Sequence, residues 1–132
     1  MSEQNPPTVW PALQAHDPDL VVRTLVALGF EETVVHRDDG GVVQHAELSW
    51  PEGGGVMLGA HKPDGPFTQQ PGTSAAYVVT RDVDAVWQRA KDAGLEPGDV
   101  VEQDYGSREC RVRDAEGNQW SFGTYAGEPR RG

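Results

Sequence analysis

The sequence repeats itself at an interval of 64 or 65 residues, and this repeat constrains the fold more than any other feature. EGNQWSFGTY at 116–125 follows the pattern of EGGGVMLGAH at 52–61, with a Glu–Gly turn and then alternating large apolar residues. The aligned pairs are Glu52 with Glu116, Gly59 with Gly123, Asp17 with Asp82 and Gly29 with Gly94. Matching turns, helix starts and helix ends predict one module used twice.

Each copy is predicted to contain a strand, a helix and three further strands. Asp17 is a typical helix N-cap, Pro18 suits the first helical position, and Gly29 is a typical helix end. Strands are indicated by alternating apolar residues bounded by Gly-rich turns. The expected strands are 9–15, 31–36, 42–50, 56–60, 74–80, 99–103, 108–113 and 119–125.

The sequence therefore predicts one α+β domain of 132 residues, built from two tandem βαβββ modules. Module 1 spans about 8–61 and module 2 about 73–125, and a linker rich in Pro and Gly, 62–72, joins them. We expect the tails, 1–7 and 126–132, to be flexible.

The charge balance excludes some classes of partner. The chain has 21 acidic and 11 basic residues, which gives a net charge of −10. This argues against nucleic acid and anionic membranes as partners, and it favours either a cationic ligand or solubility alone.

A single cysteine, Cys110, cannot form an internal disulfide or a thiolate metal site. The polar start of the chain and the lack of a long apolar run predict a cytoplasmic protein.

The stretches RDAEGNQWSFGTY (113–125) and HAELSWPEGGGVMLG (45–59), within paired βαβββ modules, resemble the vicinal-oxygen-chelate superfamily. This group contains the glyoxalases, the bleomycin-resistance proteins and the extradiol dioxygenases. The resemblance runs from about Val9 to Tyr125. It implies that each sheet curls into a half-open cup, with the helices on its convex side and a ligand cavity on its concave side.

In metal-using members of the superfamily, four side chains from the first and last strand of each module hold one divalent ion. Carried onto this sequence, those positions fall on Trp10, Met57, Ser74 or Ala76, and Ser121. None is His, Asp, Glu or Cys, and hard divalent ions need carboxylate, imidazole or water ligands. The resemblance therefore implies no metal and no other cofactor here.

Ionisable residues on the third and seventh strands are the weak catalytic candidates. His45 and Glu47 share one strand face, and Glu109 and Arg111 occupy the equivalent places 64 residues later. A His–Glu pair is able to act as a general base with its orienting partner, or to supply ligands of an unusual metal site. The alternative is a solvated strand face with cross-strand ion pairs.

The predicted ligand-binding wall combines aromatic, apolar and hydrogen-bonding side chains, as small-molecule pockets do. Trp10 offers a plane for stacking on a ring or cation, or it fills a vestigial cavity. The predicted ligand-binding residues are Trp10, Gln14, His45, Glu47, Met57, Val78, Tyr105, Glu109, Arg111 and Ser121.

Three functions stay open. The first is a metal-free protein, similar to the bleomycin-resistance branch, that sequesters an aromatic small molecule, with or without a positive charge, as a homodimer. The second is a lyase, isomerase or dioxygenase relative that uses His45, Glu47 and Glu109. The third is a regulatory or assembly role in which the cleft is a relic.

Overall fold

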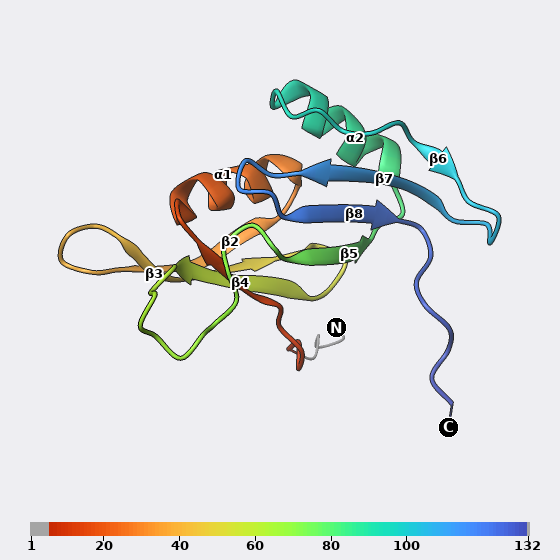
Figure 1. Ribbon diagram of the computed structural model, residues 1–132. Coiled ribbons are helices and arrows are strands. Elements are labelled where there is room, and N and C mark those ends of the chain that lie inside the picture. The colour runs from red at the N-terminus through yellow and green to blue at the C-terminus, as the bar shows by residue number, and fades with distance from the viewer. Residues whose placement is uncertain (1–5, 132) are drawn as a thin grey trace.

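The computed structural model describes residues 6–131 and forms two four-stranded mixed sheets, each with one helix (Figure 1). The first sheet has the strand order β1-β4-β3-β2 and the second has the order β5-β8-β7-β6. In chain order the elements are β1 (Ala12–Ala15), α1 (Pro18–Leu28), β2 (Glu31–Arg37), β3 (Val43–Ser49), β4 (Gly55–Ala60), β5 (Ala75–Val79), α2 (Val83–Asp92), β6 (Val101–Glu102), β7 (Arg108–Arg113) and β8 (Gln119–Gly123).

The two sheets have equivalent topologies. In each, the first strand pairs parallel with the fourth, and the other neighbouring strands pair antiparallel. The predicted α+β fold of two βαβββ modules is therefore confirmed. No helix among residues 6–131 has the length and apolar character needed to span a membrane.

Capping side chains set the helix starts where the sequence predicts them. The Asp17 carboxylate accepts a hydrogen bond from the Leu20 N–H at 3.2 Å, and Asp82 accepts one from Ala85 at 3.0 Å. Gly29 ends α1 with a φ of +123°, a conformation that favours glycine. These local signals explain why the helix boundaries follow from sequence.

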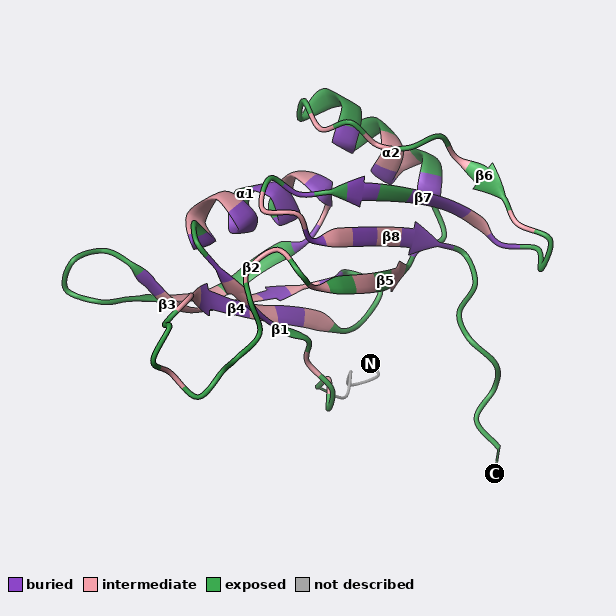
Figure 2. Ribbon diagram, in the orientation of Figure 1, coloured by how far each residue is buried: buried purple, intermediate pink, exposed green. Residues whose placement is uncertain are grey.

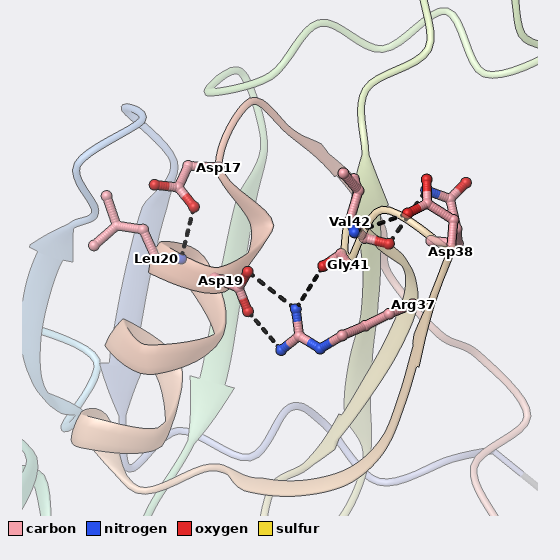
Figure 3. Close-up of polar contacts among 8 residues, drawn as sticks. Asp17, Asp19, Leu20, Arg37, Asp38, Gly41 and Val42 are labelled. Atoms are coloured by element: carbon pink, nitrogen blue, oxygen red, sulfur yellow. Dashed lines mark hydrogen bonds and ion pairs between the residues drawn. The ribbon is translucent and has the colours of Figure 1, made fainter.

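A bidentate ion pair ties the first turn of α1 to the turn between β2 and β3 (Figure 3). The Arg37 guanidinium donates to both carboxylate oxygens of Asp19, at 2.8 and 3.1 Å, and to the Gly41 carbonyl at 3.0 Å. The hydrogen bond from Arg37 is the main reason that the pKa of Asp19 lies below its usual value. The contact links the helix start to the end of β2, but both side chains are nearly half exposed, so it adds little stability.

Four aromatic side chains join the cores of the two modules. Phe30 and Trp50 belong to the first module, and Trp120 and Phe122 to the second. Ring centroids lie 4.8 Å apart for Phe30 and Trp50, and 5.7 Å apart for Trp50 and Phe122. Figure 2 shows the buried sides of both helices facing the strands, while the long loops are exposed. The core therefore continues across both modules.

Several strands are shorter than predicted. β1 starts at Ala12, three residues late, because Pro11 has no N–H to donate and the Trp10 indole donates instead to the Pro7 carbonyl. β8 ends at Gly123 because the Tyr125 N–H donates to side-chain hydroxyls rather than to a strand. β6 keeps only two residues, 101–102.

The predicted tails differ in how much of them the structure describes. Residues 6 and 126–131 are exposed and residue 7 is half-buried, and all of them lie outside helices and strands. Residues 1–5 and 132 lie outside the described part of the chain.

Candidate functional site

Each sheet packs one face against its helix and leaves the other face open. On the first sheet, Gln14, His45, Glu47 and Met57 lie on the open face, since their neighbours along each strand are core residues. Glu47 lies opposite Met57 in the β3–β4 ladder. The structure therefore brings four of the predicted ligand-binding side chains onto one surface.

His45 and Glu47 form a pair on this face. The Nε2 atom of His45 lies 2.7 Å from a carboxylate oxygen of Glu47, and the His36 ring stacks on the His45 ring at 6.2 Å between centroids. The two side chains are 40% and 28% exposed, so water competes with their contact. The arrangement suits a hydrogen-bonded ion pair, and it is also one that orients a general base.

The open face of the second sheet holds Glu109, Arg111 and Ser121. Arg111 lies opposite Ser121 in the β7–β8 ladder, and Tyr77 lies opposite Ser121 on its other side. Arg111 is exposed, while Glu109 is buried. Ser121 is therefore flanked by an aromatic ring and a cation, and by no metal-ligating side chain.

Ala76 and Val78 lie on the core side of β5, where they also line the groove between the modules described below. Ala76 pairs with Trp120 and Val78 with Phe122, so both pack on the core side of β5. Parallel pairing with β8 turns the odd-numbered residues of β5 to the open face, which puts Tyr77 there instead. Ser74, the other predicted position, lies just before the strand.

Glu109 is the centre of a hydrogen-bonded cluster, and only 7% of the residue is exposed. One carboxylate oxygen accepts from the Tyr105 hydroxyl at 2.7 Å and from Tyr77 at 3.3 Å, and the other accepts from the Gln103 amide at 3.3 Å. Burial raises the pKa of Glu109, and these donors together with Ser107 lower it by more. The carboxyl group is therefore ionised at neutral pH.

A cavity of about 600 Å³ opens over this cluster, lined by Tyr77, Tyr105, Glu109, Tyr125 and Glu128. The rings of Tyr105 and Tyr125 meet edge to face at 5.8 Å. The sequence predicted Tyr105 and Glu109 but missed the other three residues. The parity of β5 would have identified Tyr77, but that parity depends on a pairing that the sequence does not specify.

Trp10 lies before β1 and is partly buried. Its ring covers Gly55, where an added Cβ would come within 2.8 Å of the indole. Its neighbours Val9 and Pro11, and Gly55 itself, line a groove. Trp10 therefore packs beside Gly55 at the edge of the first sheet, next to residues that line this groove.

The groove lies between the modules and has a volume of about 1000 Å³. It is bounded by the β3–β4 turn of module 1 and by β5 of module 2. The Trp50 indole donates to the Val79 carbonyl at 2.9 Å and so connects its two sides. Most of the lining is apolar and includes Val9, Pro11, Phe30, Val56 and Val78; its polar side chains are Glu52, Tyr77, Thr80, Arg81 and Thr124.

The donor set does not fit a divalent metal ion. Across residues 6–131, no three His, Cys, Asp or Glu side chains are placed to share one ion, so His45, Glu47 and Glu109 do not form such a group. The positions that the resemblance implies hold indole, thioether, methyl or hydroxyl groups. Burial raises the pKa of the Cys110 thiol to about 11, which leaves it a poor nucleophile.

Comparison with protein families gives one match. The family model described as the glyoxalase/bleomycin resistance protein/dioxygenase superfamily covers residues 12–122. No curated protein matches the sequence.

Solved structures share the fold. TioX from Micromonospora sp. ML1 is 29% identical with a TM-score of 0.72, and the match covers 87% of this chain and 97% of TioX. TnmS3, an antibiotic binding protein from Streptomyces sp. CB03234, is 18% identical with a TM-score of 0.71, and 92% and 96% of the two chains are covered. A bleomycin-binding protein complexed with bleomycin is 16% identical with a TM-score of 0.65, and 90% and 98% are covered.

Proposed function

The chain belongs to the glyoxalase/bleomycin resistance protein/dioxygenase superfamily, and from this premise we propose that it binds and sequesters an aromatic small molecule without a metal ion. The observation that carries this proposal is the groove between the modules. Its volume, about 1000 Å³, is at the upper end of ordinary ligand pockets, and its mostly apolar wall contains a few polar side chains. The net charge of −10 favours a ligand that carries a positive charge.

The chemistry of the side chains supports binding over catalysis. The one thiol is buried, His45 is engaged with Glu47, and Glu109 is engaged with Tyr105. Two proteins with this fold are described as binding an antibiotic and bleomycin. Their low identity supports the fold alone, so they serve here to choose the compounds for testing.

We also propose that two chains pair as a homodimer. Val101, on the edge strand β6 and outside the groove and the tyrosine cavity, is 46% exposed, and a second copy packed there would remove this apolar side chain from water. Light scattering coupled to size-exclusion chromatography is expected to give the mass of a dimer. The mass of a monomer at micromolar concentration would contradict this pairing.

Tryptophan fluorescence tests the binding proposal, because Trp50 lines the groove. We expect a saturable change with at least one compound in a panel of aromatic, cationic antibiotics. Val79→Phe fills the groove and should weaken that binding about tenfold or more. Val42→Phe is the control, because Val42 is similarly exposed but lies in the β2–β3 turn. A flat response across the panel, or equal binding by both variants, would contradict the proposal.

The contact between His45 and Glu47 supports a second candidate, a base-dependent enzyme. The two candidates differ in the fate of the ligand. Sequestration predicts that mass spectrometry recovers the bound compound unchanged after long incubation. Turnover that disappears in His45→Ala would establish the enzyme instead.

A further inference from the structure

All three tyrosines of the sequence meet at one place, although they come from separate segments. Tyr77 lies in β5, Tyr105 in the turn between β6 and β7, and Tyr125 just after β8. They are 43%, 61% and 40% exposed. Three large aromatic side chains around one cavity form a surface that gains free energy when a ligand covers it.

Glu109 gives this cavity a negative charge that is not held in a direct ion pair, although the charge of Arg111 reaches Tyr105 from the same sheet face. Of the described residues 6–131, no Lys, Arg or His side chain forms an ion pair with it. Its partners Tyr105, Tyr77 and Gln103 are neutral donors, so they stabilise the carboxylate without cancelling its charge. A buried charge of this kind favours a cation as ligand.

The tyrosines stay neutral beside it. Hydrogen bonding to Glu109 raises the pKa of Tyr105, and hydrogen bonding to Glu128 raises that of Tyr125. Both phenols are therefore protonated at physiological pH, and their ring faces carry the negative potential that attracts an organic cation. One buried carboxylate, Glu109, and one exposed carboxylate, Glu128, with neutral phenols offer too few oxygen ligands for Ca²⁺ or Mg²⁺.

Close packing holds the cluster in place. A Cβ added to Gly123 would overlap the Tyr77 hydroxyl and come within 2.8 Å of the Glu109 side chain, so the approach of these two residues requires glycine there. The Tyr125 N–H donates to the hydroxyls of Tyr77 and Ser107, both at 3.1 Å. The hydroxyls are thus fixed before a ligand arrives.

The internal repeat shows that the scaffold does not require this cluster. The first module has Gly59 where the second has Gly123, but it has His45 in place of Glu109 and Gly41 in place of Tyr105. Each module forms its own four-stranded sheet, and the two sheets have the same topology. The side chains over Glu109 are therefore particular to the second module.

We propose that Tyr77, Tyr105, Tyr125 and Glu109 form an aromatic cage for an organic ammonium group, either a quaternary ammonium or a protonated alkylamine. The inference deepens the proposed function and rests on it, because Tyr77 lines both the cage and the groove. The cage holds the cationic end of the ligand, and the groove holds its aromatic part.

The test compares choline with its uncharged tert-butyl analogue, in which carbon replaces nitrogen. Nitrogen–proton correlation NMR of the full chain is expected to show saturable shifts at residues 77, 105 and 125 with choline alone. Glu109→Gln should bind choline about tenfold more weakly. Glu96→Gln is the control, because it removes the same charge at an exposed position outside the cage.

Tyr105→Leu is a second variant, chosen because Tyr105 is exposed and its loss leaves the core intact. It should also weaken choline binding, whereas Phe67→Leu, at a 60% exposed position in the linker, should not. Equal binding of the uncharged analogue, unchanged binding by Glu109→Gln and Tyr105→Leu, or no shifts with choline would overturn the cage.

The cage and the proposed function fail separately. Suppose that Val79→Phe abolishes binding of aromatic compounds, while choline causes no shifts or causes the same shifts in wild type and in the cage variants. The groove then stands as the binding site and the cage is wrong. If choline binds as expected but no aromatic compound occupies the groove, the ammonium site stands and the proposed function is wrong.

Discussion

A carboxylate oxygen of Glu116 lies 2.6 Å from the backbone nitrogen of Asp17, which joins the turn before β8 to the start of α1. The other oxygen accepts from the His16 N–H at 2.8 Å. In the opposite direction, Glu52 accepts from the Arg81 N–H at 2.9 Å, one residue before the N-cap of α2. Equivalent glutamates of the repeat therefore bind the helix start of the other module.

These contacts place negative charge at helix N-termini, where the helix dipole favours it. They also fix the position of each β-turn relative to the opposite module. We call the two glutamate contacts, of Glu52 and Glu116, the reciprocal clamps. Glu52 and Arg81 line the groove, so the Glu52 clamp helps to set the width of the groove.

Replacement of Glu116 with Ala is expected to lower the free energy of unfolding by about 1 to 2 kcal/mol, because the carboxylate loses two charge-assisted hydrogen bonds that it accepts from backbone N–H groups. Glu52→Ala, which removes one, should cost less. Urea denaturation measures both effects. The control is Glu96→Ala, which is exposed; an equal loss there would show that the clamp adds no stability.

Asp114 is expected to be among the most sensitive polar positions. One oxygen accepts from the N–H groups of residues 116, 117 and 118, and the other accepts from the Asn118 amide and the Trp120 indole. Because the residue is buried, Asp114→Ala should cost about 2 to 4 kcal/mol. Asp38→Ala, in an exposed turn, provides the comparison by thermal denaturation and should cost less.

Protonation of Glu109 at acid pH is expected to lower both the free energy of unfolding and the affinity for choline. Burial raises its pKa and its hydrogen bonds lower it by more, so the folded-state value lies below the usual 4.5. A lowered pKa adds stability that is present above the unfolded-state value and is lost as the pH falls through the folded-state value. The stability difference between wild type and Glu109→Gln should thus shrink steadily below pH 4.5, as followed by urea denaturation. A difference that is constant with pH would contradict this.

The Cys110 thiol is expected to resist alkylation until the protein unfolds. Burial raises its pKa to about 11, so about one thiol in a thousand is ionised at pH 8. Mass spectrometry after iodoacetamide treatment should show labelling in denaturant and almost none in buffer. Rapid labelling of the folded protein would mean that the second sheet opens at β7.

The purified protein is expected to contain well under one metal ion per chain, because the described side chains offer no matching donor set. A chelator should leave the melting temperature unchanged. Stoichiometric Zn, Ni, Mn or Fe that is lost in His45→Ala would contradict this result and favour the enzyme alternative.

Local signals account for what the sequence predicted correctly. Asp17 and Asp82 cap helices through their own backbone, and Gly29 ends one through its own φ. Repetition of these signals identified two modules. Strand ends were less well predicted, as at Pro11 and Tyr125, because they depend on where each N–H finds its acceptor.

The candidate site was only partly predictable for the same reason. Alternation along β3 placed His45 and Glu47 on one face, but their direct contact and the stacking of His36 needed the fold. On β5 the sequence did not identify Tyr77 as an open-face residue, because a strand of five residues has two possible parities and its pairing with β8 selects one. That selection is what brings Tyr77 to Glu109.

The sequence by itself determined the repeated βαβββ unit, the helix boundaries and the absence of metal-ligating residues at the positions that the family resemblance implies. Each of these depends on residues close together in the chain or on the comparison of its two halves. The tertiary structure decided the groove between the modules, the reciprocal clamps of Glu52 and Glu116, and the tyrosine cluster around Glu109. These features join residues far apart in sequence, and only the packing of strand on strand and module on module brings them within hydrogen-bonding distance.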